Sequence, residues 1–262
     1  MKTGFSTNAF TGFSLFNAIE IISDIGYKGI EIVVDEPHAF LPLTSNEIKK
    51  IWNLLNEKEL SVSNLNSNTI IGWHSKNKIK EKFEPSLSNI NETLREWRID
   101  YTKKAIDLAN ELNSPSVCIT SGMKNTERFE MEMELFKKSL LEVLEYAEKY
   151  DVEIGIEYEP GLLIENSKSV FDLSREFSNL GLNLDTCHVE VCKEDFSEII
   201  QKFKNKIIHT HVSDCMNGEH YHLIPGHGEI DFANTLSFEN ISLTDKHTAN
   251  YLILILCIYI SF

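Results

Sequence analysis

Residues 154–161 read Ile-Gly-Ile-Glu-Tyr-Glu-Pro-Gly, and this stretch carries much of the information on the fold. Apolar and small residues that suit a buried strand come first, two carboxylates follow at alternate positions, and Pro-Gly then turns the chain. Because strand side chains alternate, Glu157 and Glu159 point the same way as Gly155. A carboxylate at the carboxyl end of a barrel strand faces the region where such folds keep their chemistry. For either glutamate alone, a solvated turn residue is the simpler interpretation.

Outward from this stretch, the chain alternates strand patterns with helical patterns. The strand patterns are rich in Ile and Val and lie at Lys2–Asn8, Gly29–Val34, Ser61–Asn66, Ser116–Thr120, Val152–Glu157, Leu182–Asp185 and Ile207–Val212. The helical patterns lie at Ser14–Ile25, Ser45–Glu59, Arg128–Tyr150, Phe171–Phe177 and Phe196–Phe203. Strands separated by helices imply parallel βαβ units, which fit either a doubly wound sheet or a barrel. No GxGxxG or GxxxxGK[ST] follows the first strand, so the usual nucleotide-binding sheet has no support.

Length and composition restrict the class of protein. The 262 residues suit one domain, since an α/β barrel typically needs about 250 residues. A formal net charge of −15 disfavours a nucleic-acid partner, because an acidic surface repels phosphate backbones. Five cysteines without a CxxC pair are typical of a reducing compartment. The amino-terminal residues lack a signal-peptide core, and the apolar run Tyr251–Phe262 is shorter than the ~20 residues of a membrane-spanning helix. We therefore expect a soluble, cytoplasmic protein without a membrane partner, and a homo-oligomer is compatible with this composition.

The longest connection between these elements is Thr69–Asp100. It is polar and contains Trp73, Trp97 and Pro85. Long connections in compact domains are often functional, so this one is either a lid over the barrel mouth or a solvated excursion. The sequence leaves both interpretations open.

Two further strand patterns end in groups that bind metals. Asp185 ends one strand, and His188 lies three residues on, so both can reach one ion if the chain turns between them. The alternative is that Asp185 caps the next turn and His188 lies at the surface. In Ile207–Val212, His209 and His211 share a face. With His211 at the rim as a candidate ligand, His209 lies one layer deeper as a packed or supporting histidine.

A histidine-rich segment follows the last of these strands. His220 and His222 can reach a metal or an anion, whereas we expect His227 to be exposed. Gly226 and Gly228 indicate a loop that is folded tightly against its neighbours.

The ends of three successive strands therefore carry Glu157, Asp185 and His211 in this order. Oxygen and imidazole donors without a thiolate suit one divalent ion, namely Mn²⁺, Mg²⁺, Co²⁺ or Zn²⁺.

The motifs IEYEPG, LDTCH, HTHVSD and HLIPGHGEIDF, in this order, resemble the signatures of the xylose isomerase-like barrel superfamily. That group holds sugar phosphate isomerases and epimerases, inosose dehydratase-like enzymes and AP endonucleases. The resemblance runs from residue 1 to about Phe232. It implies an α/β fold of the (β/α)₈ TIM barrel type over residues 1–232. It also implies a divalent-metal-dependent isomerase or epimerase that acts on a small sugar or sugar phosphate.

The resemblance also implies roles for single residues. Glu157, Asp185 and His211 would ligate one divalent cation, with a fourth ligand, a glutamate, from the last strand. Glu157 and that last glutamate would form an acid/base pair across a metal-stabilised enediolate. His188 would contact the substrate, although in the AP endonuclease branch it would ligate an additional zinc. We expect the substrate pocket to be lined by Glu31, Glu159, His188 and His222.

The chain departs from this family after Phe232. Residues 233–262 form an atypical segment in which Glu239 is the only glutamate. The run Tyr251–Phe262 has the composition of a buried strand. Either it inserts beside the first strand and closes the barrel, or it stays exposed and favours aggregation. In both cases it brings no carboxylate, so a non-catalytic barrel is the main alternative to an enzyme.

A DNA-repair endonuclease is the less favoured alternative. The third and fourth strand patterns, SVSNLNSN and SVCITSGM, lack the histidines that AP endonucleases use for extra zinc ions. The acidic net charge argues in the same direction.

Overall fold

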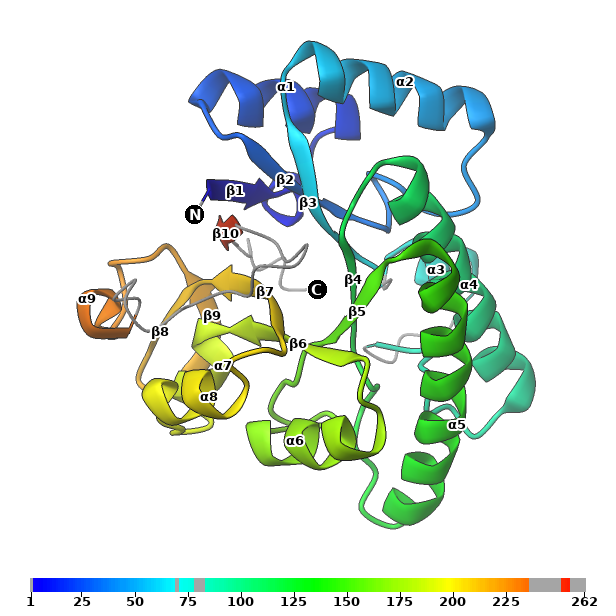
Figure 1. The fold of residues 1–262 in the computed structure, drawn as a ribbon, viewed down its shortest axis with the longest axis vertical. Helices are drawn as coiled ribbons and strands as arrows, with labels where there is room; N and C mark the ends of the chain where they lie inside the picture. Colours follow the sequence, from blue (N-terminus) through cyan, green and yellow to red (C-terminus); the bar gives the residue numbers. More distant parts are fainter. Residues whose placement is uncertain (1, 69–70, 78–82, 236–250, 255–262) are drawn as a thin grey trace.

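The computed structural model describes residues 2–68, 71–77, 83–235 and 251–254. Within them, parallel strands close into a barrel in the order β1-β10-β7-β6-β5-β4-β3-β2 (Figure 1). The strands are β1 (Lys2–Ser6), β2 (Gly29–Val33), β3 (Ser61–Asn66), β4 (Ser116–Ile119), β5 (Glu153–Ile156), β6 (Leu180–Asp185), β7 (Ile207–Val212) and β10 (Tyr251–Leu254). The predicted α/β barrel is therefore confirmed.

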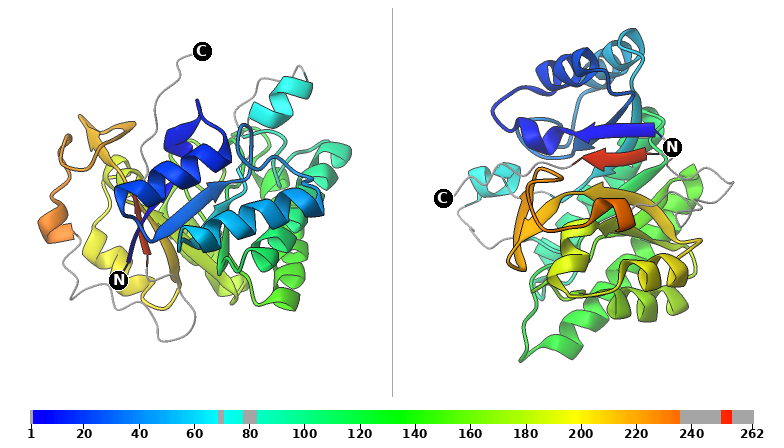
Figure 2. Two further views of the ribbon diagram at one scale, coloured as in Figure 1. Left: turned by 90° about the horizontal axis from the view of Figure 1, so that it is seen from above. Right: turned by 90° about the vertical axis from the view of Figure 1, so that its left-hand side faces the viewer.

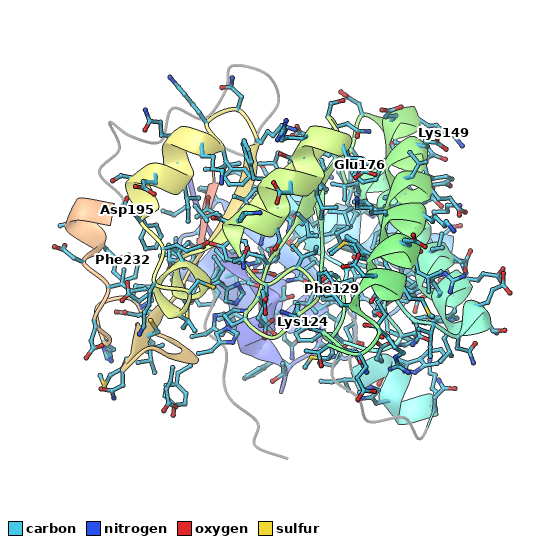
Figure 3. The ribbon with its side chains drawn as sticks, turned by 90° about the horizontal axis from the view of Figure 1, so that it is seen from below. Lys124, Phe129, Lys149, Glu176, Asp195 and Phe232 are labelled. Atoms are coloured by element: carbon cyan, nitrogen blue, oxygen red, sulfur yellow. The ribbon has the colours of Figure 1, made fainter. Side chains whose placement is uncertain are left out.

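Helices cover the outside of the barrel (Figure 1). They are α1 (Leu15–Ile25), α2 (Ser45–Glu57), α3 (Ile71–Lys76), α4 (Glu92–Glu111), α5 (Phe129–Ala147), α6 (Ser167–Glu176), α7 (Thr186–Val191), α8 (Phe196–Lys202) and α9 (Phe232–Thr235), with 3₁₀ turns η1 (Thr7–Phe10) and η2 (Glu148–Tyr150). Figure 3 shows α5 at one side of the molecule, between Phe129 and Lys149, and α8 and α9 at the other, near Asp195 and Phe232. No helix in the described part of the chain is long and apolar enough to cross a membrane.

Local sequence signals explain where the first helices begin and end. The side chain of Ser14 accepts a hydrogen bond from a backbone N–H of α1, and Gly26 ends that helix with a φ of +105°. The helix buries one apolar face, formed by Leu15, Ala18, Ile19 and Ile22. At α2, Thr44 and Glu47 form a reciprocal capping box. Both helices therefore start where the sequence pattern predicts, and α2 ends at Glu57, two residues before its predicted end.

An extra residue in β7 shapes the interior of the barrel. The pairing of β7 with β6 passes from Ile207 directly to His209, which leaves Ile208 as a β-bulge. The side chain of Ile208 packs over two glycines of neighbouring strands. A Cβ added at Gly181 would lie 2.6 Å from Ile208 Cγ2, and one added at Gly155 would lie 2.9 Å from Ile208 Cδ1. The glycines therefore provide the space that the bulge fills.

The carboxyl-terminal run forms the strand that closes the barrel. Strand β10 pairs in parallel with β1 on one side and with β7 on the other, and the right-hand view of Figure 2 shows it beside β1. Insertion beside the first strand is thus the observed outcome for residues 251–254. Residues 236–250 and 255–262, which include Glu239, lie outside the described residues. A domain boundary at residue 232 stays a prediction.

The interpretation of Thr69–Asp100 as one long connection is wrong in part. Its last residues already belong to α4, which begins at Glu92. The helical pattern is weak because α4 buries the polar residues Arg98 and Thr102 among its apolar ones. Trp73 of α3 lies against Trp97 of α4, with ring centroids 4.2 Å apart. This contact shows a packed segment, and a lid function stays a prediction.

The sequence patterns also missed a small antiparallel hairpin after β7. Its strands are β8 (Asp214–Met216) and β9 (Glu219–Leu223). Strands of three and five residues give no clear hydrophobic alternation, but the Asn217-Gly218 pair between them is a typical two-residue hairpin turn and was the signal that could have identified the hairpin.

The packing of Ile208 gives a stability prediction. We expect Gly181→Ala to lower the free energy of unfolding by about 1–3 kcal/mol, because the new methyl group meets Ile208. Ile208→Ala removes that contact, so the double variant should lose less than the sum of the two single losses. Denaturant unfolding of the three variants measures both effects. Strictly additive losses would show that the two positions do not interact.

Candidate metal centre at the carboxyl ends of the strands

Three side chains from neighbouring strands converge at the carboxyl end of the barrel. Glu157 directly follows β5, Asp185 ends β6 and His211 lies in β7. Their ligand atoms all lie within 4.8 Å of one another. The register pairs Asp185 with His211 across β6 and β7, so the sheet itself brings two of the three together.

The distances within this group suit a cation. His211 Nδ1 lies 2.6 Å from Glu157 Oε1 and 4.0 Å from Asp185 Oδ2. Asp185 is 1 % exposed, and its Oδ2 atom has no hydrogen-bond partner among the described residues. A buried carboxylate oxygen without a partner needs an explanation, and a bound ion is one. Two carboxylates and an imidazole form a donor set that divalent metals accept, so the residues fit such an ion.

Asp185 also holds the chain that follows it. Its Oδ1 atom accepts hydrogen bonds from the backbone N–H of Cys187 at 2.7 Å and of His188 at 3.4 Å, which caps α7. Ser213 Oγ donates to the same atom at 3.1 Å. The two interpretations of Asp185 are therefore compatible: one oxygen caps the turn, and the other faces the cluster.

Glu31 lies on the far side of His211. Its Oε2 atom is 2.8 Å from His211 Nε2 and accepts a hydrogen bond from Asn64 Nδ2 at 2.7 Å. Ser6 Oγ donates to its Oε1 atom at 2.8 Å. Glu31 is the third residue of β2 and is fully buried. Its carboxylate is fully engaged with the protein.

His209 occupies the deeper layer that its spacing from His211 predicts. It is 2 % exposed, and its Nε2 atom lies 3.2 Å from Glu31 Oε2. The two imidazole rings are nearly perpendicular, with centroids 5.2 Å apart. Asn183 Nδ2 lies 3.0 Å from His211 Nδ1, which adds a neutral contact to the same ring. His211 is therefore fixed from several strands at once.

Three members of this network escaped the sequence analysis, namely Ser6, Asn64 and Asn183. Asn183 lies two residues before Asp185, so strand alternation places both on one face. Asn64 is a buried polar residue of β3. Polar residues at inward positions of buried strands were the signal that could have identified them.

A second group of histidines adjoins the three converging residues. His188 Nε2 lies 2.8 Å from His220 Nε2, and His220 Nδ1 lies 3.5 Å from Glu159 Oε1. His222 Nδ1 lies 3.5 Å from Asp185 Oδ2. The residues expected to line the mouth, His188, His222 and Glu159, are thus brought together beside Asp185.

A buried carboxylate of β8 holds the loop that follows the hairpin of His220 and His222. Asp214 accepts hydrogen bonds from the backbone N–H of Gly226 at 2.9 Å, of Gly228 at 2.8 Å and of Ile230 at 3.1 Å. The loop is therefore folded tightly, as its glycines predict. His227 at its tip is exposed, also as expected.

Charge shifts the protonation of the central groups. Burial alone would lower the pKa of His211, but the charges of Glu31 and Glu157 outweigh burial and hold that pKa well above its usual range. Burial would raise the pKa of Glu31, yet the charge of His211 keeps it well below its usual range. Burial also opposes the shift at Asp185, where the surrounding histidines lower the pKa to about 2. At His222, burial dominates and lowers the pKa to about 4. The high pKa of His211 keeps its imidazole protonated without a metal. A cation that binds to this imidazole would therefore displace a proton.

Comparison with known proteins agrees with this geometry. The family described as xylose isomerase-like TIM barrel matches residues 19–238. The fructoselysine 3-epimerase of Shigella flexneri is 27% identical over 237 residues, which cover 88% of this chain and 82% of that protein.

Solved structures show the same fold. A D-tagatose 3-epimerase-like protein has a TM-score of 0.79 at 24% identity, covering 97% of this chain and 90% of that chain. The IolI protein with a bound zinc atom has a TM-score of 0.77 at 19% identity, covering 98% and 89%. Since the family match extends over most of the sequence, the chain belongs to the xylose isomerase-like TIM barrel family.

Proposed function

We propose that this protein is a divalent-metal-dependent isomerase or epimerase that acts on a small sugar or sugar phosphate. The observation that carries the proposal is the convergence of Glu157, Asp185 and His211 within 4.8 Å at the carboxyl end of the barrel. The sugar epimerase among its relatives supports the same class of reaction. Because that relative is named for fructoselysine, a ketose that carries an amino acid is one candidate within the substrate class.

In this proposal, Glu157, Asp185 and His211 hold one ion. When bound, a divalent ion polarises carbonyl and hydroxyl oxygens and stabilises negative charge that develops on them. Glu157 is the proposed catalytic residue, because it belongs to the cluster and its carboxylate can move a proton at the reacting carbon. The pKa of His222 near 4 leaves it neutral at pH 7, so it can accept a hydrogen bond from a sugar hydroxyl. His188 and Glu159 complete that side of the pocket.

We propose a positioning function for Glu31 in place of substrate binding. Its carboxylate contacts His211 Nε2, while the Nδ1 atom of the same ring faces Glu157 and Asp185. A carboxylate on one imidazole nitrogen fixes the ring for metal binding through the other. Full burial of Glu31 removes it from contact with a substrate at the mouth.

A DNA-repair endonuclease is the second candidate function. The close group Asp185, His188 and His222 favours it, because a further ion could bind there. The acidic chain disfavours it, so we expect no nicking of duplex DNA that contains an abasic site.

A non-catalytic barrel is the third candidate, since β10 brings no carboxylate to the cluster within the described residues. A cytoplasmic location and the absence of nucleic-acid and membrane partners remain part of the proposal.

Metal binding gives the first test. We expect Mn²⁺ at about 100 times its dissociation constant to add about 2.7 kcal/mol of stability, seen as a higher melting temperature. His211→Ala and Asp185→Asn should abolish that increase, because each removes a ligand. His227→Ala is the matched control, since this exposed histidine lies outside the cluster and should leave the increase unchanged. Equal metal content in His211→Ala, Asp185→Asn and the unmodified protein would reject the site.

Turnover gives the second test. A metal-supplemented screen of ketoses and their phosphates should reveal epimerised or isomerised product. We expect Glu157→Gln to reduce the rate by roughly 10²–10⁴-fold, because an amide cannot take the proton. Product formation at the same rate in Glu157→Gln would exclude Glu157 as the catalytic residue. Strong turnover in the unmodified chain would exclude the non-catalytic barrel.

The positioning function of Glu31 gives a third test. Glu31→Gln keeps the size of the side chain but removes the charge that holds His211, so metal affinity should fall by roughly 10–100-fold. The ¹⁵N chemical shifts of the His211 ring should change at the same time, because the preferred tautomer is no longer fixed. A loss of thermal stability with unchanged affinity and unchanged ring shifts would show a purely structural residue.

A further inference from the structure

Asn183 places a buried amide beside the metal centre. It lies in β6 two residues before Asp185, so strand alternation turns both side chains to the same face, the interior of the barrel. Asn183 is fully buried. Its Nδ2 atom lies 3.0 Å from His211 Nδ1, and its Oδ1 atom has no hydrogen-bond partner among the described residues. A buried amide oxygen without a partner needs an explanation.

The ring nitrogen that Asn183 contacts is the point where the candidate ligands meet. His211 Nδ1 lies 2.6 Å from Glu157 Oε1 and 4.0 Å from Asp185 Oδ2. The other ring nitrogen, Nε2, is occupied by Glu31 at 2.8 Å. A cation bound by the three converging residues would therefore take Nδ1, with the Asn183 amide as its immediate neighbour.

A cation on His211 Nδ1 is incompatible with the present orientation of the Asn183 amide. The ion uses the lone pair of Nδ1, so the N–H groups of Asn183 lose their acceptor, and the positive charge repels them. The last side-chain torsion of asparagine has a broad, roughly two-fold profile, so a half-turn that exchanges Nδ2 and Oδ1 is accessible. This half-turn gives the buried oxygen a partner and leaves the amide nitrogen no worse paired than the ion had already made it.

The spacing and chemistry of this amide suit a ligand. Asparagine carbonyl oxygens are among the ligands of hard divalent cations. In an octahedral shell with bonds of about 2.1 Å, neighbouring ligand atoms lie about 3.0 Å apart. The 3.0 Å between the Asn183 amide and His211 Nδ1 matches this spacing. Within the described part of the chain, β10 brings no carboxylate, so the shell has room for another ligand.

We propose that Asn183 is a fourth protein ligand of the cation, through Oδ1. This ligand role rests on the metal centre of the proposed function and adds a residue to it. An amide supplies an oxygen without a further negative charge, so it adds no repulsion to the buried carboxylates of Glu31, Glu157 and Asp185.

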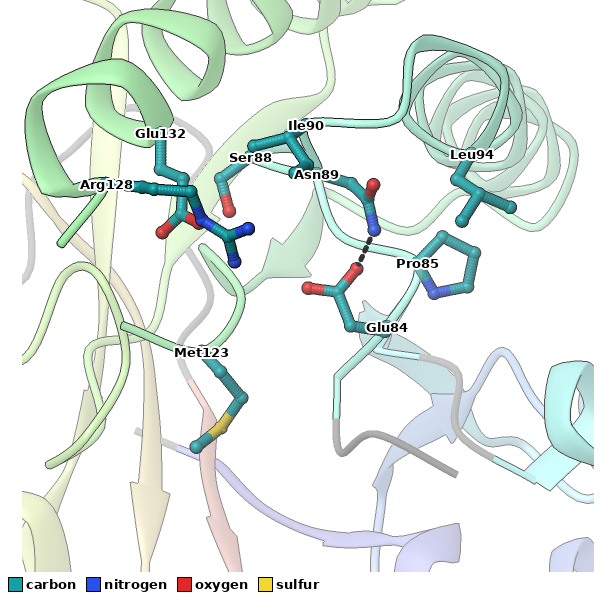
Figure 4. Close-up of a pocket in the computed structure, with 9 residues that line it drawn as sticks. All are labelled: Glu84, Pro85, Ser88, Asn89, Ile90, Leu94, Met123, Arg128 and Glu132. Atoms are coloured by element: carbon teal, nitrogen blue, oxygen red, sulfur yellow. Dashed lines mark hydrogen bonds and ion pairs between the residues drawn. The ribbon is translucent and has the colours of Figure 1, made fainter. Parts of the chain in front are cut away.

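A buried oxygen elsewhere shows that the lack of a partner alone does not make a ligand. Glu132 lines a cavity of about 390 Å³ between the starts of α4 and α5 (Figure 4), and its Oε2 atom is buried without a partner among the described residues. Its Oε1 atom lies 3.3 Å from Arg128 Nε. None of the close groups of potential metal ligands in the described ranges includes Glu132. Asn183 differs because it contacts a residue of the metal centre.

Mn²⁺ binding by the full chain tests the proposal without turnover. Calorimetric titration gives the dissociation constant, and the relaxation of solvent protons gives the number of water molecules on the bound Mn²⁺. We expect Asn183→Ala to weaken binding at least about 10-fold, since even supporting residues of metal sites contribute that much. It should also add one bound water, which takes the vacated position. Asn183→Asp should bind Mn²⁺ more tightly with an unchanged water number, because a charged oxygen replaces the amide oxygen.

Two control variants separate a ligand from other buried polar residues. Asn64 is buried and donates to Glu31, which holds His211, so Asn64→Ala should lower the affinity and leave the water number unchanged. Glu132→Gln should change neither quantity, because this residue lies outside the metal centre.

The outcomes separate this proposal from the proposed function. An unchanged affinity or an unchanged water number in Asn183→Ala would overturn the ligand role of Asn183, while Mn²⁺ binding that His211→Ala abolishes would still support the metal centre. No Mn²⁺ binding by the unmodified chain would overturn both. Circular dichroism shows which variants keep the fold. If Asn183→Ala does not, Mn²⁺ binding by Asn183→Asp that is no tighter than in the unmodified chain decides against the proposal.

Discussion

A histidine held between two buried carboxylates is the interaction on which the rest of the structure depends. His211 contacts Glu31 through one ring nitrogen and Glu157 through the other. Removing one partner from such a buried group commonly costs 3–5 kcal/mol, because the remaining charge is left uncompensated. The barrel must therefore close with β2, β5 and β7 in one exact register. The bulge at Ile208, which keeps His211 in register with Asp185, belongs to that requirement.

The fold was largely predictable because most barrel strands and helices have a recognisable sequence pattern within their own residues. Short runs of Ile and Val between breakers gave the first seven barrel strands to within a few residues, and Ser14 marked the start of α1. Local rules failed where an element has little hydrophobic pattern of its own. Helix α4 was absent from the predicted helices, because its polar residue Arg98 is buried by hydrogen bonds to distant segments. Tertiary context decided these cases, as it often does for propensity.

For the site, the sequence predicted how residues of one strand are arranged relative to each other, but not which residues of different strands touch. Alternation predicted His209 below His211, and in the structure His209 contacts the buried Glu31. It also predicted Glu157 and Glu159 on one face, and in the structure Glu159 contacts His220 of the neighbouring histidine group. Contacts across the barrel have no such local signature. Glu31 and His211 are 180 residues apart in sequence, so nothing in the spacing of either strand reveals that they touch. Glu31 could be placed in the interior from its strand, but its partner could not be named.

The last strand shows that closing the barrel and completing the metal centre have different requirements. Strand β10 joins β1 and β7 through backbone hydrogen bonds, which any apolar run of suitable length can make. Its residues Tyr251–Leu254 therefore complete the barrel without supplying a carboxylate. Among the described residues, and beside the proposed ligand Asn183, a metal held by Glu157, Asp185 and His211 would then take its remaining ligands from His188, His222 or water. Closure of the sheet protects the buried charges, and affinity for the ion depends separately on the side chains at its edge.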